Sequence, residues 1–204
     1  MPEKVFLSLA SIFVLLLLSV HAGKSAEIGL SRQELAGSVP HVTVIALIIS
    51  GQIVKGDAKK VEALLSDIKH TNNVHTMRRL LIHSPGGLIA EAMEIGRLAR
   101  TNNFEVFIPQ ELTCISACVL VLAGGATRTV VGRVGLHHPL FLRDPGPGDN
   151  VPALMSETKK MIRTYLNSMG IADDLADAMF SIPDGTVHYL SHDELLLYRL
   201  TELR

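Results

Sequence analysis

The sequence lacks any concentration of positive charge. No run of Lys and Arg exceeds two residues, and 19 basic residues stand against 20 acidic ones, giving a formal net charge of −1. Proteins that bind a phosphate backbone or an anionic membrane surface carry clustered basic residues. We therefore expect neither nucleic acid nor an anionic lipid surface among its partners.

Long apolar runs are also missing from most of the chain. After residue 26 no stretch is long and apolar enough to span a membrane, and no internal repeat, coiled-coil pattern or low-complexity tail is present. A chain of 204 residues with 48% hydrophobic content can bury one sizeable core. We therefore expect a single folded domain over residues 27–204.

The first 26 residues have the pattern of a secretory signal peptide. Lys4 precedes an almost wholly apolar stretch at residues 5–20, and small residues follow at Ala22 and at Ser25 and Ala26. The alternative is an uncleaved anchor, since the apolar stretch approaches the length that tethers a protein to a bilayer. Both readings place the remainder outside the cytoplasm.

Cysteine occurs only twice, at Cys114 and Cys118. In an exported protein this spacing allows a disulfide if Cys114 precedes a helix and Cys118 lies in its first turn. Two small buried side chains in a tight corner are the other reading. A thiol nucleophile paired with His137 and a zinc site are further alternatives, although thiolates are easily oxidised outside the cytoplasm and the spacing is unusual for zinc.

The first half of the domain alternates apolar strands with amphipathic helices. Residues 41–50 are nearly continuous in apolar side chains and rich in β-branched ones, and residues 79–83 and 104–108 are shorter, largely apolar segments, which is typical of buried strands. Helical spacing of apolar residues follows Asp57, which we expect to cap its helix, and recurs over residues 88–99. This order predicts an α/β fold with a parallel sheet. Residues 26–39 are left unassigned.

The second half repeats this pattern with shorter elements. We expect a buried helix at residues 116–122, strands at 128–131, 133–136 and 186–190, and helices at 154–169 and 173–181. The Pro- and Gly-rich residues 139–152 predict a loop. Ser191 and Glu194 predict a capping box on a last helix.

Three corners in this pattern carry residues suited to hydrolysis. Gly86 and Gly87 follow a strand and leave helix N–H groups free to bind an oxyanion. Ser116 begins a helix, where the N–H of Ala117 would be a second donor. His137 ends a strand and would serve as a base. Each has a simpler reading: turn glycines, a helix N-cap and a hydrogen-bonded surface histidine.

The order of these motifs resembles the Clp-type serine peptidases of the crotonase-like superfamily. The similarity rests on Ser84-Pro85-Gly86-Gly87, on Ser116 among small residues, and on Leu136-His137-His138-Pro139, and it runs from about residue 45 to the end. It is strongest with an exported, periplasmic bacterial branch that carries a Cys-x-Ser-x-Cys cluster.

The resemblance implies a spiral of βαβ units, frequent homo-oligomers assembled through the helix at 154–169, and hydrolysis of peptide or protein substrates without cofactor or metal. Ser116 matches the nucleophile, His137 the base, and Gly87 with Ala117 the oxyanion donors. The expected aspartate position, however, holds Val187, so Asp184 is the candidate acid, and Asp193 is a weaker substitute.

Three functions therefore follow from the sequence. The first is an exported serine hydrolase, which we expect to be a peptidase. The second is a non-catalytic periplasmic binding or scaffold protein that keeps the fold and has lost the acid. The third, an enzyme acting on coenzyme A thioesters, fits poorly because that cofactor is not available outside the cytoplasm.

Overall fold

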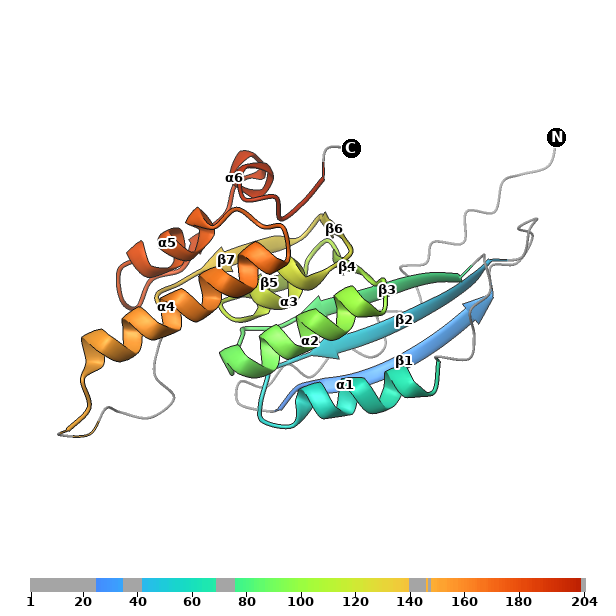
Figure 1. The fold of residues 1–204 in the computed structure, drawn as a ribbon. Helices are drawn as coiled ribbons and strands as arrows, with labels where there is room; N and C mark the ends of the chain where they lie inside the picture. Colours follow the sequence, from blue (N-terminus) through green and yellow to red (C-terminus); the bar gives the residue numbers. More distant parts are fainter. Residues whose placement is uncertain (1–24, 35–41, 69–75, 140–145, 147, 203–204) are drawn as a thin grey trace.

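A computed structural model describes residues 25–34, 42–68, 76–139, 146 and 148–202 (Figure 1). The predicted signal peptide falls almost entirely outside the described residues, as does part of the predicted loop at 139–152. No helix within the described ranges is long and apolar enough to cross a membrane.

Eight strands form two sheets in the described part of the chain. The larger has the order β1-β2-β3-β4-β6 and the smaller β5-β7-β8. The large-sheet strands are β1 (Glu27–Glu34), β2 (Thr43–Ser50), β3 (Thr76–His83), β4 (Glu105–Ile108) and β6 (Thr127–Val130). The small-sheet strands are β5 (Thr113–Ile115), β7 (Arg133–Leu136) and β8 (His188–Tyr189). Strands β2, β3, β4 and β6 run parallel, as the sequence predicts.

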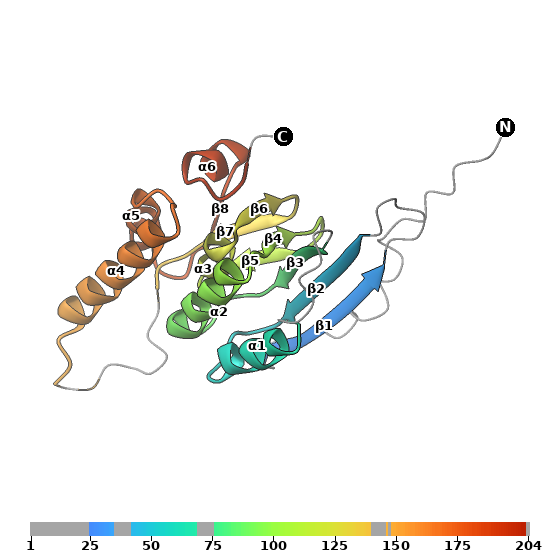
Figure 2. The same ribbon diagram turned by 45° about the vertical axis from the view of Figure 1, so that its right-hand side comes forward.

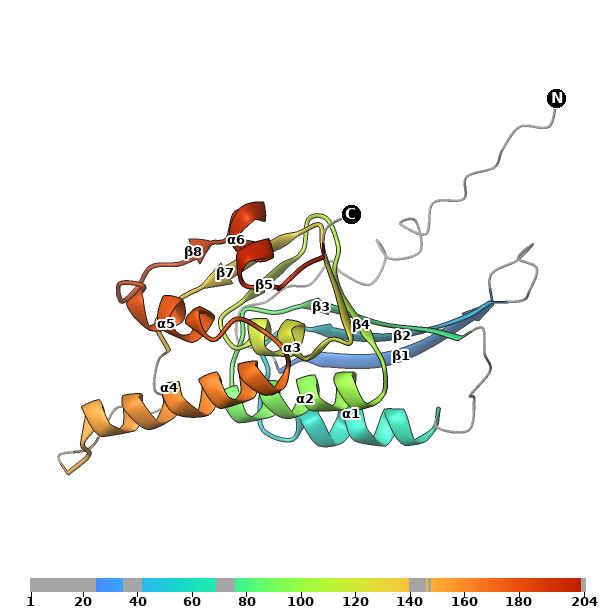
Figure 3. The same ribbon diagram turned by 45° about the horizontal axis from the view of Figure 1, so that its top comes forward.

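The described residues form six helices, of which the first three cover one face of the large sheet (Figure 3). They are α1 (Asp57–Ser66), α2 (Ile89–Thr101), α3 (Cys118–Gly124), α4 (Val151–Ser168), α5 (Asp174–Ser181) and α6 (His192–Leu197). Figure 3 shows α1 and α2 below the sheet with α3 between sheet and helices. All residues of α3 are buried, because this short helix is apolar on every side. Its burial fixes the end of β5 from which it starts.

The core follows from alternation along the strands. In β2, Ile45, Leu47 and Ile49 are fully buried and their neighbours are half-buried. Helices α4, α5 and α6 gather at the end of the molecule away from β1 (Figure 2). There the buried Tyr165 of α4 donates a hydrogen bond from its hydroxyl to the Leu120 carbonyl at 2.7 Å. This bond ties α4 to α3.

Two strands escaped the sequence analysis. Strand β1 pairs antiparallel with β2 at the sheet edge, and its polar, largely exposed sequence gave no strand pattern. Strand β5 has only three residues and is held by its parallel pairing with β7. Both depend on partners distant in the sequence, which local periodicity does not report.

Of the two predicted helix caps, one is present in the structure and the other is not. The capping box of Ser191 and Glu194 is present and confirms that prediction. The expected cap by Asp57 is wrong: Gly56, at φ 95°, is the N-cap. Asp57 is instead buried, and its Oδ2 accepts from the Val54 N–H at 2.8 Å. Glycine fits there because the left-handed conformation disfavours other residues.

Candidate active site

The central feature is a tight turn between β5 and α3, residues 114–118, which we call the nucleophile turn because it holds Ser116, the nucleophile expected from the sequence. Ser116 lies at its middle with φ 59°, a left-handed conformation that costs a residue with a side chain about 1–2 kcal/mol. The helix begins at Cys118, with Ala117 as N-cap. Ser116 therefore precedes the cap, which removes the simpler reading of this serine as the helix N-cap.

Backbone hydrogen bonds hold the nucleophile turn on three sides. The Ser116 N–H donates to the Gly135 carbonyl at 3.0 Å, and the Ile115 N–H donates to the Ser84 carbonyl at 3.0 Å. The Ser116 carbonyl accepts from the Val119 N–H at 3.0 Å. The strained backbone of Ser116 is thus stabilised by strands on either side and by the helix that follows.

A disulfide closes the same turn. Cys114 and Cys118 are bonded to each other, with their Cα atoms 5.3 Å apart, and both are fully buried. This bond consumes the thiols that a cysteine nucleophile or a zinc site would need. Within the described ranges no other group of His, Cys, Asp and Glu side chains could hold a metal ion.

The second feature is the turn at residues 84–87, which we call the donor turn. Gly86 has φ 101° and Gly87 has φ 142°, values that L side chains rarely adopt. A Cβ on Gly86 would lie 2.6 Å from the Ser116 Cβ, and one on Gly87 would lie 2.0 Å from the Ile53 carbonyl oxygen. Both glycines are therefore required by backbone conformation, and by close approach to the nucleophile turn for Gly86 and to the Ile53 backbone for Gly87.

The donor turn and the nucleophile turn each offer a backbone N–H. The Gly86 N–H is used internally, since it donates to Ser84 Oγ at 3.0 Å. The N–H groups of Gly87 and Ala117 have no acceptor among the described residues. A Cβ on Gly86 would lie 3.0 Å from the Ala117 nitrogen, so the two turns are in direct contact. Free amides close to a serine are what an oxyanion hole requires.

His137 follows directly on β7, at the same edge of the small sheet as Ser116. Strands β5 and β7 are parallel with Ile115 opposite Gly135, so their carboxyl ends meet there. His137 Nδ1 lies 2.6 Å from the His138 carbonyl oxygen. In the tautomer that donates from Nδ1, Nε2 carries a free lone pair and can act as a base.

No hydrogen bond joins the Ser116 hydroxyl to His137 in the described part of the chain. The Ser116 side chain is half-buried, and so is that of His137. In proteins without bound substrate such hydrogen bonds are often long and shorten only when substrate closes the site. The structure brings the two residues to one edge without pairing them.

The acid expected next to His137 is missing. Strands β7 and β8 pair antiparallel with Leu136 opposite His188, so the next position along places Val187 opposite His137. Asp184 is exposed and makes no hydrogen bond or ion pair within the described residues. His137 Nδ1 is instead within hydrogen-bond distance of the His138 carbonyl oxygen. The structure thus gives Asp184 no contact through which to act as the triad acid.

The second histidine belongs to a different contact. His138 Nδ1 lies 3.1 Å from the Phe180 carbonyl oxygen of α5, and the two rings meet edge to face at 5.6 Å. Because successive residues of an extended chain point to opposite sides, only one of the pair faces the sheet edge. His138 attaches α5 to the site and its side chain is not a second base.

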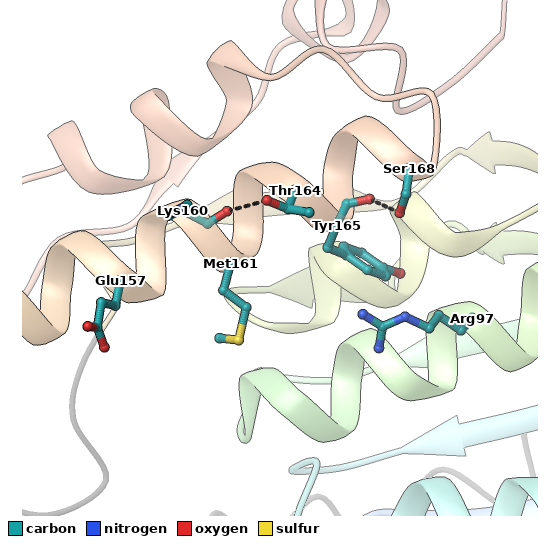
Figure 4. Close-up of a pocket in the computed structure, with 7 residues that line it drawn as sticks. All are labelled: Arg97, Glu157, Lys160, Met161, Thr164, Tyr165 and Ser168. Atoms are coloured by element: carbon teal, nitrogen blue, oxygen red, sulfur yellow. Dashed lines mark hydrogen bonds between the residues drawn. The ribbon is translucent and has the colours of Figure 1, made fainter.

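A surface groove lies elsewhere, between α2 and α4. It has a volume of about 360 Å³ and is lined by residues such as Arg97, Met161 and Tyr165 (Figure 4). The Arg97 guanidinium lies 5.3 Å from the Tyr165 ring centroid. None of the candidate site residues lines this groove, and the sequence analysis did not anticipate it.

The chain matches no protein-family model and no curated protein sequence. Its fold is similar to two solved structures of a 1510-N membrane-bound stomatin-specific protease. One is a serine-to-alanine mutant, with TM-score 0.59 and 16% identity over 78% of this chain and 76% of that one. The other is a lysine-to-alanine mutant in complex with a substrate peptide, with TM-score 0.60 and 18% identity over 78% and 72%.

At these identities the likeness concerns the fold. The chain shares with these two structures a mixed α/β fold, with a mostly parallel sheet flanked by helices, and this confirms the predicted fold class. The activity and the roles of individual residues have to be argued from the site itself.

Proposed function

We propose that this protein is an exported serine peptidase in which Ser116 is the nucleophile and His137 the general base. One observation carries the proposal: Ser116 is held at φ 59° against the donor turn, beside the free N–H groups of Gly87 and Ala117. A purely structural turn has no need of a strained serine beside unpaired amides.

In the proposed reaction, Ser116 Oγ attacks the carbonyl carbon of a peptide bond while His137 Nε2 takes the hydroxyl proton. The negative charge that develops on the carbonyl oxygen is stabilised by the N–H groups of Gly87 and Ala117. His137 then gives its proton to the leaving amine, and an acyl group remains on Ser116. Water, activated by His137, releases the acid and restores the serine. The mechanism uses no cofactor or metal.

The His138 carbonyl takes the orienting role that an aspartate has in a triad. It lies 2.6 Å from His137 Nδ1 and so favours the tautomer in which Nε2 is the base. A carbonyl carries only a partial charge, so it stabilises the imidazolium less than a carboxylate does. We therefore propose a slow Ser116–His137 dyad, without a part for Asp184.

Export and assembly are proposals of the same kind. The N-terminal pattern at residues 1–26 supports export, with a tether through residues 5–20 if it is not cleaved, and a disulfide fits an oxidising compartment such as the periplasm. Helix α4 exposes Leu154 and Met161, which supports a homo-oligomer contact there. The peptide substrate is proposed from the fold and from the substrate-bound state of the similar protease.

A scaffold protein that has lost its chemistry is the second candidate. The valine opposite His137 and the exposed Asp184 favour it, since a Clp-type triad would have its carboxylate near His137. This candidate and the peptidase differ in one measurable property, the reactivity of Ser116.

The test is labelling of the purified protein with a fluorophosphonate, followed by peptide mapping. We expect label on Ser116 that is absent in Ser116→Ala and strongly reduced in His137→Ala. Asp184→Asn is a matched control and should be labelled like the native protein. Absence of label on Ser116 in the native protein would establish the scaffold instead, and loss of label in Asp184→Asn would restore the triad.

A further inference from the structure

The two bonded cysteines, Cys114 and Cys118, lie two residues before and two residues after Ser116. Cys114 lies in β5, opposite Val134 of β7, and Cys118 is the first residue of the buried helix α3. The bridge therefore joins the strand that enters the nucleophile turn to the helix that leaves it.

The turn is under conformational strain that this bridge opposes. Ser116 has a left-handed backbone although it carries a side chain, and such a residue relaxes unless its surroundings hold it. Relaxation of Ser116 would rotate the peptide that follows it, which carries the Ala117 N–H. The hydroxyl and one of the two free amides would then leave their positions together.

Global stability explains the bridge poorly. A sequence separation of 4 closes a very small loop, and the chain entropy that a disulfide removes from the unfolded state grows with loop length. Helix α3 is in any case fixed by complete burial. What the bridge can restrain beyond these contacts is the local geometry of residues 115–117.

From these observations we infer that the Cys114–Cys118 disulfide is a positioning device for catalysis, which holds the Ser116 hydroxyl and the Ala117 N–H in their reactive arrangement. Neither sulfur takes part in the reaction. The inference rests on the proposed function, because it concerns the same serine. Removal of the bridge should slow acylation of Ser116 while the protein stays folded and still binds its ligands.

The first experiment compares the full-length native protein with Cys114→Ala/Cys118→Ala. The rate constant for inactivation by a fluorophosphonate should fall by roughly a hundredfold, the effect of a small displacement of reacting groups. The concentration at half-maximal rate should not change, because binding is not altered. An inactivation rate equal to that of the native protein would overturn the inference.

A matched control removes a similar volume without touching the bridge. Val121 lies one helical turn after Cys118 and is fully buried. Val121→Ala should lower the thermal midpoint about as much as the double variant does, yet keep the native inactivation rate. If Val121→Ala slowed inactivation equally, the bridge would be only part of the packing and the inference would be wrong.

A second measurement applies if the double variant does not fold. The native protein is treated with tris(2-carboxyethyl)phosphine in urea below the unfolding transition; the phosphine becomes its oxide, water supplies the oxygen, and both sulfurs become thiols. The inactivation rate should fall and return after reoxidation with glutathione disulfide. An unchanged rate in the reduced protein, or two free thiols found by alkylation of the untreated protein, would overturn the inference.

The two levels of proposal fail differently. If Ser116 of the native protein is never labelled, the proposed function fails and this inference fails with it. If native Ser116 is labelled and the bridge-free protein is labelled at the same rate, the peptidase stands and the positioning role alone is rejected.

Discussion

The nucleophile turn and the segment at residues 183–189, which we call the acid segment, are built in opposite ways. The nucleophile turn is closed by a buried disulfide, bonded to two strands and packed against a glycine. Every residue of the acid segment is exposed, and its only regular structure is the two-residue strand β8 at its end. In a catalytic triad the side chains of both regions would have to be held with comparable precision.

This difference shows which part of the chemistry the fold supports. The serine and the amides are held by the main chain of three strands and a helix, whereas the base is oriented by the carbonyl of its own neighbour. Under the proposed mechanism, such a site stabilises the tetrahedral intermediate through the amides, whereas the imidazolium is stabilised only weakly. Slow turnover with a reactive serine is the expected behaviour.

The largest effect on stability is expected in the donor turn, where Gly87 packs against the Ile53 backbone. In Gly87→Ala the new Cβ would lie 2.0 Å from the Ile53 carbonyl oxygen, and the alanine would have to adopt a φ of 142°. The free energy of unfolding should therefore fall by about 3 kcal/mol or more. Urea unfolding measures this change. Gly29→Ala is the control, because nothing lies within 4 Å of its Cβ. Equal stability of the two variants would show that the donor turn is not rigid.

The next effect concerns the acid segment. Val187→Asp would place a carboxylate opposite His137 and should raise the rate of hydrolysis, up to the roughly 10⁴-fold that a triad aspartate contributes. Val187→Asn has nearly the same size and no charge, and should leave the rate unchanged. Steady-state kinetics with a peptide or ester substrate measures the difference. Equal rates in both variants would show that the missing charge does not limit the dyad.

The smallest effect is expected in the first turn of α6, where Glu194 accepts hydrogen bonds from the Ser191 N–H and from His188. These bonds lower the pKa of Glu194 to about 2, the Ser191 backbone bond being the largest cause. A lowered pKa in the folded state means that the charge stabilises the protein above the ordinary value of 4.5. That contribution is lost as the pH falls towards 2.

Glu194→Gln keeps the capping acceptor and removes the charge. Because the side chain is partly exposed, the thermal midpoint should fall by only about 2 °C at neutral pH. The difference from the native protein should shrink between pH 4.5 and about 2. Glu62→Gln, which removes a carboxylate from the exposed face of α1, is the control variant. A difference that is constant with pH would assign the effect to packing.

Much of the fold could be read from local pattern. Strands β2 and β3, helices α2 and α4, and the capping box of α6 are recovered because each has its own periodicity or cap. The edge strand β1 and the short strand β5 could not be, since they exist through pairing with distant residues. The Asp57 cap failed because a buried carboxylate had a better donor in the Val54 N–H.

The residue types of the candidate site can be recognised directly in the amino-acid sequence. It contains the glycine pair, the serine between two cysteines, the histidine before a proline and the valine where an aspartate was expected. Backbone conformation was not readable in the same way, because φ 59° at Ser116 is unfavourable for serine and no local signal predicts it.

The arrangement of these residues depends on tertiary contacts. The strain at Ser116 persists because Gly135, Ser84 and the disulfide hold the turn from outside, and the pairing of β7 with β8 brings Val187 to the end of β7, where its side chain lies against Gly135. These contacts join residues far apart in the chain, so their energies do not appear in any local window of sequence. The residues proposed as donors and nucleophile can be recognised in the sequence, and their arrangement arises only when the two sheets and α3 pack together.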